Sequence, residues 1–220
     1  MIVTLDGPAG AGKSTIARRL AQRLGFAFLD TGAMYRAVTL AALRNQGPWD
    51  DPQALADLAL HCQIDLDGSH VRLNGEDVSE LIRSIEVTSH IHYLADNPSV
   101  REQMVELQRA LAVGKDLVTE GRDQGTVAFP NAECKIFLTA SPQERAKRRA
   151  QELQTRGERI SVDEILEQQN DRDYRDSIRK TGRLEPAPDA IGVSTDDMSP
   201  DEVVERLVEI VREKTRQADG

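Results

Sequence analysis

The sequence has 220 residues, of which 39% are hydrophobic and 30% charged, a composition typical of one soluble domain with a buried core. Its 28 basic and 37 acidic side chains give a formal net charge of −9, which disfavours nucleic acid as a partner. No apolar run is long enough to span a membrane, and the first residues lack a signal-peptide pattern, so we expect a cytoplasmic protein without a membrane partner. Cys62 and Cys134 are too few for a disulfide scaffold and lack metal-ligand spacing.

The first part of the chain alternates between strand and helix patterns. Short apolar runs predict buried strands over residues 1–6 and 26–29. Apolar residues at helical spacing predict helices over residues 13–24 and 31–45. Gly25 stands where the residue after a helix is commonly glycine.

The middle of the chain changes character between Gln63 and Val78, where apolar and polar residues alternate around the strong hairpin turn signal Asn74-Gly75. We expect a small antiparallel element inserted there into an α/β chain. Further along, the pattern predicts a helix that follows Pro98-Ser99 and runs to about Ala112, and strands over residues 116–119 and 135–139.

Three serines mark helix starts in the last third, because each is followed three residues later by glutamate, the capping-box pattern. They are Ser141, Ser161 and Ser199. Residues 187–193 predict one more strand. Strands that alternate with helices favour an α/β fold, with a mostly parallel five-stranded sheet flanked by helices.

A glycine-rich segment after the first strand carries the strongest functional signal. It fits the P-loop pattern G-x-x-x-x-G-K-[ST] at every fixed position, which predicts the P-loop NTPase fold. Glycines let successive backbone N–H groups converge on one anion, and the following helix directs its positive end to the same place. Lys13 is expected to reach the β- and γ-phosphates, and Ser14 to ligate Mg²⁺. The predicted ATP-binding residues here are Gly7, Pro8, Ala9, Gly10, Ala11, Gly12, Lys13, Ser14 and Thr15.

The rest of the sequence indicates what receives the phosphate. The Asn-Lys-x-Asp guanine-binding motif of GTPases is missing, and the chain is short for a motor or transporter ATPase. Arginines are numerous, and guanidinium groups bind phosphate oxygens in bidentate fashion and neutralise charge during phosphoryl transfer. The sequence therefore favours a kinase of a small phosphorylated acceptor. The arginines concerned are Arg36, Arg101, Arg122, Arg172, Arg175 and Arg179.

Three longer motifs accompany the P-loop. They are Asp30-Thr31-Gly32-Ala33-Met34-Tyr35-Arg36, Glu120-Gly121-Arg122-Asp123-Gln124-Gly125-Thr126-Val127-Ala128-Phe129-Pro130 and Arg172-Asp173-x-x-Asp176-Ser177-x-Arg179. With them, essentially the whole chain resembles the bacterial cytidylate kinase family of P-loop nucleoside monophosphate kinases. The resemblance implies ATP-dependent phosphorylation of CMP and dCMP to CDP and dCDP, with Mg²⁺ as cofactor. We expect a monomer acting on small-molecule substrates.

The resemblance also implies how the single domain is organised. The core is expected at about 1–33, 114–150 and 181–220, the inserted nucleoside-monophosphate-binding region at about 34–113, and a short helical lid at about 151–180. Two lid arginines, Arg156 and Arg159, fit a solvated charged face equally well.

The same resemblance implies roles for individual residues. Arg36, Arg122 and Arg179 would hold the acceptor phosphate, with a polar contact from Thr31. Arg101 and Asp123 would bind cytosine, Asp176 the sugar hydroxyls, and Arg172 both sugar and phosphate, while Arg148 would lie near the ATP adenine. His92 replaces a serine usual in the family, at a position associated with the cytosine pocket. The catalytic set would be Lys13, Arg122, Arg172 and Arg179.

Elementary chemistry is consistent with these roles. A carboxylate at Asp123 can accept from the cytosine amino group, whereas uracil would oppose it with a carbonyl oxygen. No general base is required, because the attacking phosphate has a second pKa of about 6 and is already anionic. Glu120 would either orient Mg²⁺ through water or be structural. Arg122 and Asp123 have an alternative interpretation as a surface ion pair.

Two other functions stay open at this point. One is a P-loop kinase for a different small acceptor, and the other is a nucleotide-binding module that changes conformation for a partner. The arginine set with Asp123 favours a phosphorylated acceptor, because an acceptor without phosphate has no use for it.

Overall fold

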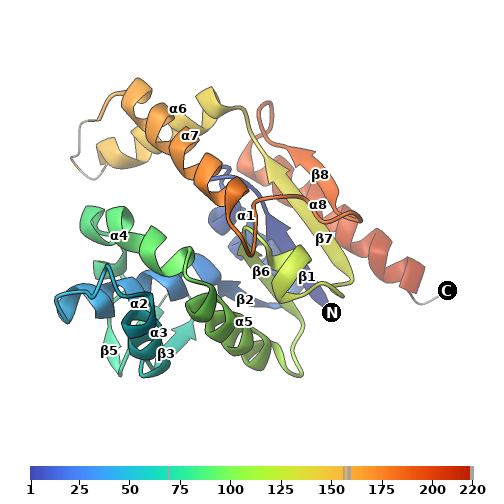
Figure 1. Cartoon of the computed structure of the whole chain (residues 1–220). Coiled ribbons are helices and arrows are strands. Elements are labelled where there is room, and N and C mark those ends of the chain that lie inside the picture. The colour runs from blue at the N-terminus through green and yellow to red at the C-terminus, as the bar shows by residue number, and fades with distance from the viewer. Residues whose placement is uncertain (69, 156, 158–159, 219–220) are drawn as a thin grey trace. The chain divides into compact units, whose positions relative to one another are not determined.

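The computed structural model describes residues 1–68, 70–155, 157 and 160–218, so Arg156 and Arg159 lie outside the described residues. The chain divides into two compact units (Figure 1). Unit 1 comprises Met1–Phe28 and Gly114–Gly220, and unit 2 comprises Leu29–Val113. Among the described residues, none of the helices combines the length and the apolar character that crossing a bilayer requires.

The larger sheet has five strands in the order β2-β6-β1-β7-β8. Central β1 pairs in parallel with β6 and β7, and β7 pairs in parallel with β8. The sheet belongs to unit 1, except that the last two residues of β2 begin unit 2. The predicted α/β fold with a mostly parallel five-stranded sheet is confirmed. Its strands are β1 (Ile2–Asp6), β2 (Ala27–Asp30), β6 (Leu117–Gly121), β7 (Cys134–Thr139) and β8 (Ile191–Ser194).

Helices of unit 1 flank this sheet. α1 and α8 contact each other, and α6 and α7 lie side by side (Figure 1). Between the sheet and helices α1 and α8 lies a core that includes the fully buried Leu5, Leu20, Ile136 and Leu207. The helical elements are α1 (Lys13–Leu24), α6 (Pro142–Thr155), α7 (Val162–Ile178), α8 (Pro200–Ala218) and the π-helical turn η2 (Gln124–Ala128).

Two local predictions in unit 1 need correction. The capping boxes at Ser161 and Ser199 are complete, but the one at Ser141 is only half formed, because Asp196 accepts the Ser141 N–H at 2.7 Å. The last strand starts at Ile191 rather than at residue 187. Residues 187–190 form a turn instead, closed by a 2.9 Å backbone hydrogen bond.

Unit 2 combines four helices with a small antiparallel sheet of order β3-β4-β5. The predicted turn at Asn74-Gly75 joins β4 to β5, with φ of 52° and 84°, as a two-residue hairpin turn of this type requires. Helices α3 and α4 were not predicted, although Asp51 and Ser84 cap their first turns. The elements are α2 (Thr31–Arg44), α3 (Pro52–Leu60), β3 (Ile64–Asp67), β4 (His70–Leu73), β5 (Glu76–Asp77), η1 (Leu81–Arg83), α4 (Ile85–Ala95) and α5 (Pro98–Ala112).

Candidate active site

The glycine-rich loop connects the carboxyl end of the central strand β1 to the amino end of α1, the arrangement that the P-loop pattern predicts. Gly10 and Gly12 have φ of 78° and 83°, a conformation that side chains rarely adopt. At Gly7 the constraint is close approach, because a Cβ atom there would lie 2.0 Å from the Leu138 backbone oxygen. Glycine therefore shapes the loop at three of its positions.

Lys13 and Ser14, the first two residues of α1, carry the polar side chains of the loop. Lys13 is buried and donates from Nζ to the Pro8 carbonyl at 2.8 Å. Burial, together with the charges of Arg122 and Arg172, lowers the pKa of Lys13 to about 7. The ammonium group therefore lies in surroundings that favour the arrival of anionic charge.

An oxygen-rich pair lies beside the loop. Ser14 Oγ donates to Glu120 Oε1 at 2.7 Å, and Glu120 belongs to the buried strand β6. Within the described part of the chain, no group of three or more His, Cys, Asp or Glu side chains is placed to hold a metal ion. A hydroxyl with one carboxylate nevertheless fits Mg²⁺, which binds through one or two protein oxygens, substrate phosphates and water.

Asp6 is a buried residue that the sequence analysis did not single out, although it directly precedes Gly7. Its two carboxylate oxygens accept from the backbone N–H groups of Gln124 at 2.8 Å and Gly125 at 2.7 Å. Burial raises the pKa of Asp6 to about 7, against the effect of these two hydrogen bonds. Asp6 thus fixes the start of η2, immediately after Asp123.

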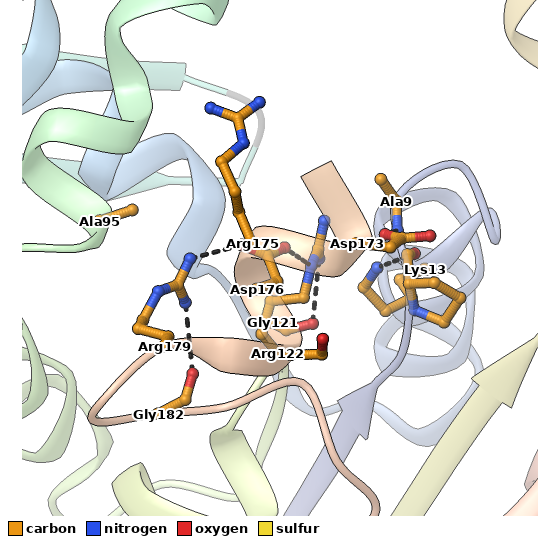
Figure 2. A network of polar contacts seen from close by, with 12 residues as sticks. Ala9, Lys13, Ala95, Gly121, Arg122, Asp173, Arg175, Asp176, Arg179 and Gly182 are labelled. Carbon is orange, nitrogen blue, oxygen red and sulfur yellow. Dashed lines mark hydrogen bonds and ion pairs between the residues drawn. The ribbon is translucent and has the colours of Figure 1, made fainter. Parts of the chain in front are cut away.

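A second group of charged residues gathers around Asp176 on α7 (Figure 2). Arg122 donates from Nε to Asp176 Oδ2 at 2.9 Å, and Arg179 donates to Asp176 Oδ1. Arg179 also donates to the Gly182 carbonyl at 3.2 Å. Burial raises the pKa of Asp176, but the charges of Arg122, Arg172 and Arg179 outweigh burial and hold that pKa below its usual value.

This arrangement decides between two interpretations of Arg122-Asp123. The side chain of Arg122 contacts Asp176, and Asp123 is only 5% exposed, so a surface ion pair between neighbours is wrong. Arg172 acts electrostatically on both Lys13 and Asp176. Unit 1 therefore brings together all four predicted catalytic residues, three arginines and the lysine of the loop.

Arg148, predicted near the adenine, lies on α6. Its guanidinium donates to the Thr195 side-chain oxygen at 2.9 Å and to the Thr195 carbonyl at 2.7 Å. Three residues earlier on the same helix, Arg145 contacts the phosphate loop through the Ala9 carbonyl at 2.6 Å. Sequence reasoning missed Arg145, because its partners are distant in the chain.

Unit 2 carries Thr31 and Arg36 on α2. Thr31 is buried at the first position of the helix. Arg36 donates to the Ile82 carbonyl at 3.2 Å and to Thr88 Oγ1 at 2.9 Å. The Arg36 guanidinium is thus oriented by η1 and α4.

Arg101 and His92 lie on the last two helices of unit 2. Arg101 is buried, donates to the Ala95 carbonyl at 3.0 Å, and has its guanidinium carbon 5.7 Å from the centre of the Tyr35 ring. His92 on α4 has its ring centre 4.2 Å from that of Tyr93. The Arg101 guanidinium is thus oriented by the end of α4 and lies over the Tyr35 ring of α2.

The fold and the loop define the class. A glycine-rich loop after the central strand of a parallel sheet, followed by a helix, is the architecture of P-loop NTPases. A gluconokinase from Sinorhizobium meliloti 1021 has a similar solved structure, with a TM-score of 0.52 and 14% identity, covering 98% of this chain and 94% of the gluconokinase. At that identity the similarity shows the fold alone.

Sequence comparison defines the family. The family model described as Cytidylate kinase matches residues 3–213. A cytidylate kinase of Rhodopirellula baltica is 56% identical, covering 97% of this chain and 93% of the relative. A cytidylate kinase of Caldanaerobacter subterraneus is 47% identical, covering 97% and 96% respectively. This chain belongs to the cytidylate kinase family and is a kinase.

One group of relatives contains the matching region within a longer protein. A bifunctional pantoate ligase/cytidylate kinase of Synechococcus is 44% identical over 96% of this chain, which matches 40% of that relative. The residues compared here thus correspond to one part of that longer protein.

Proposed function

We propose that this chain catalyses ATP-dependent phosphorylation of CMP and dCMP to CDP and dCDP. The observation that carries the proposal is the convergence in unit 1 of Lys13, Arg122 and Arg179 beside a P-loop, with Asp176 orienting the two arginines. Such cations bind phosphates and neutralise charge during transfer. Family membership supports the choice of a nucleotide acceptor.

For the donor, we propose that the backbone and side chains of residues 7–15 bind the ATP phosphates, with Arg148 towards the adenine. Mg²⁺, when bound, would neutralise phosphate charge. Ser14 would ligate it and Glu120 would orient it through water, consistent with the contact between these two side chains.

For the acceptor, we propose that Arg36, Arg122 and Arg179 hold the phosphate. Asp123 would accept from the cytosine amino group while Arg101 donates to the ring acceptors. The remaining proposed contacts are with the sugar from Asp176 and Arg172, and polar contacts from Thr31 and His92.

The proposed reaction requires alignment of the two phosphates and does not require abstraction of a proton. An oxygen of the acceptor phosphate, anionic at neutral pH, forms a bond to the γ-phosphorus of ATP while the bond from that phosphorus to the ADP oxygen breaks. Lys13 and the three arginines stabilise the charge that shifts onto the leaving ADP. We propose that the segment at about 151–180 closes as a lid and excludes water, which would otherwise compete as acceptor.

We further propose a monomeric, cytoplasmic enzyme that needs neither nucleic acid nor membrane, in keeping with the net charge of −9. The most direct test measures ADP formation from ATP with CMP, dCMP, UMP, AMP or GMP as acceptor. We expect turnover with CMP and dCMP well above the other three. No ADP with CMP, or equal rates with all five, contradicts the proposal and favours another acceptor or a nucleotide-binding switch.

The variant Asp123→Asn tests how the enzyme distinguishes cytosine from uracil. Removing the charge and one acceptor removes the repulsion of uracil, so the ratio of kcat/KM for CMP over UMP should fall at least about tenfold, or about 1.4 kcal/mol. The ratio cancels any general loss of active enzyme, because both substrates are measured on the same preparation. An unchanged ratio means that Asp123 does not bind the base.

A further inference from the structure

One face of α7 contacts the phosphate loop through Asp173, a residue to which the sequence motif assigned no role. Asp173 Oδ1 accepts the Ala9 N–H at 2.9 Å, and Oδ2 accepts from Arg145 Nη1 at 2.5 Å (Figure 2 shows Asp173 beside Ala9). Arg145 in turn donates to the Ala9 carbonyl. Both backbone polar groups of one loop residue are therefore bound by this acid–base pair.

The pair is shielded from solvent, which strengthens it. Side-chain exposure is 5% for Arg145 and 16% for Asp173. Arg145 also donates from Nε to the Ala140 carbonyl at 3.2 Å, so several acceptors fix its guanidinium plane. A charged pair with this many hydrogen bonds holds one geometry, in contrast with exposed ion pairs.

Gln169, one turn before Asp173 on the same face of α7, contacts the next loop residue. A Cβ atom at Gly10 would lie 2.6 Å from Gln169 Nε2, so the amide packs directly against that glycine. Gln169 is 8% exposed. Two side chains of α7 thus cover Ala9 and Gly10, consecutive residues of the loop.

The arginine cluster lies within one turn of Asp173, at the carboxyl end of the same helix. Asp176, three residues after Asp173, accepts from Arg122 and Arg179, and Arg172 immediately precedes Asp173. A rotation or shift of α7 would therefore move these groups relative to Lys13. Along α7, Asp173 lies between Gln169 and Asp176, and it is hydrogen-bonded directly to the loop at Ala9.

We propose that Asp173 is a positioning residue, which fixes the phosphate loop to α7 and so sets the placement of Arg172 and Asp176 relative to Lys13. The inference rests on the proposed phosphoryl transfer. Asp173 need not touch either nucleotide, because it acts through Ala9 and Arg145. Small misplacements of reacting groups reduce turnover by up to about 100-fold, while each nucleotide alone still finds its own contacts.

The test compares Asp173→Asn with Asp171→Asn, the same chemical change at an exposed position two residues earlier on α7. We expect kcat to fall about 10- to 100-fold for Asp173→Asn. Dissociation constants for ATP and for CMP, each measured alone by calorimetry, should stay within about threefold of wild type. Asp171→Asn should match the wild type in all three quantities.

A second readout does not depend on activity. The Ala9 amide hydrogen should exchange with solvent slowly in the wild type, and about tenfold or more faster in Asp173→Ala, because its acceptor is removed. Asp173→Glu keeps the charge towards Arg145 and should recover part of the lost turnover. This conservative variant also separates positioning from a failure to fold.

Three results would overturn the inference. They are unchanged kcat in Asp173→Asn, a proportional loss of kcat and of both affinities that follows the melting temperature, and unchanged exchange at Ala9. Failure of the proposed function would differ, since wild type and Asp171→Asn would then also form no ADP with CMP, whereas the exchange experiment would still report the contact.

Discussion

The cluster around Asp176 makes a quantitative prediction about stability. In Asp176→Asn, the carboxylate that accepts from Arg122 at 2.9 Å and from Arg179 is replaced by a neutral amide of equal size. Two largely buried guanidinium groups then lose the carboxylate that they share, and breaking a buried pair from one side costs about 3–5 kcal/mol. Arg179 keeps the Gly182 carbonyl and Arg122 keeps the Gly121 carbonyl, which places the expected loss near about 3 kcal/mol.

The assay is thermal unfolding at pH 7, monitored by circular dichroism without nucleotide. For a chain of this size, about 3 kcal/mol lowers the melting temperature by about 6–12 °C. The control is Glu205→Gln, which breaks the exposed ion pair with Arg23 at 2.5 Å and should cost less than about 1 kcal/mol. A loss below about 1 kcal/mol in Asp176→Asn would refute the conclusion that this carboxylate neutralises the arginines.

The pH dependence of that difference follows from the sign of the pKa shift. The arginines lower the pKa of Asp176, so its stabilising contribution is present above the ordinary carboxyl pKa of about 3.8 and is lost as the pH falls through the lowered value. Wild type and Asp176→Asn should therefore differ by a constant amount near neutral pH and converge in strong acid.

Two further predictions concern buried groups elsewhere in unit 1 and unit 2. Gly7→Ala should lower the free energy of unfolding by about 3 kcal/mol or more, because its Cβ atom would meet the Leu138 backbone oxygen. The Cβ atom of Gly12→Ala meets no atom within 4 Å, so this variant should lose only about 1–2 kcal/mol to left-handed backbone strain. Equal melting temperatures for the two variants would contradict this prediction. Burial raises the pKa of Cys134 to about 11, so at pH 8 a disulfide reagent should leave this thiol unmodified until the protein unfolds. The half-buried Cys62 should react first. Modification of Cys134 before unfolding would contradict its burial.

Local patterns in the sequence accounted for the phosphate loop and most strands. The loop was predictable because its function depends on contiguous residues, glycines followed by Lys13 and Ser14. The hairpin at Asn74-Gly75 was predictable for the same reason, since a positive φ at two adjacent residues has a short-range signature. Helix α3 has a comparable local signal in Asp51-Pro52, and its prediction was missed rather than impossible.

Contacts between distant segments had no comparable signal. Ala9 and Asp173 are 164 residues apart, and Asp6 and Gln124 are 118 apart, so neither pairing follows from spacing or periodicity. The partner of Arg122 likewise became visible only in the fold, because Asp176 is 54 residues further along the chain. The identity of the charged residues could be read from the motifs, whereas their pairing required the fold.

The pairing explains how a protein can keep so many cations near one loop. The lowered pKa of Lys13 shows the effect of these neighbouring charges, because burial and the cations Arg122 and Arg172 lower it together. Without Asp176 and Asp173, the neighbouring guanidinium groups would repel one another and turn towards solvent. The two carboxylates hold these groups in place. The free-energy cost of desolvating the arginines therefore arises when the chain folds, and not when a nucleotide binds. Preorganised charge of this kind needs little rearrangement during phosphoryl transfer, and on this ground we propose that Asp173 and Asp176 contribute to turnover through the arginines that they hold.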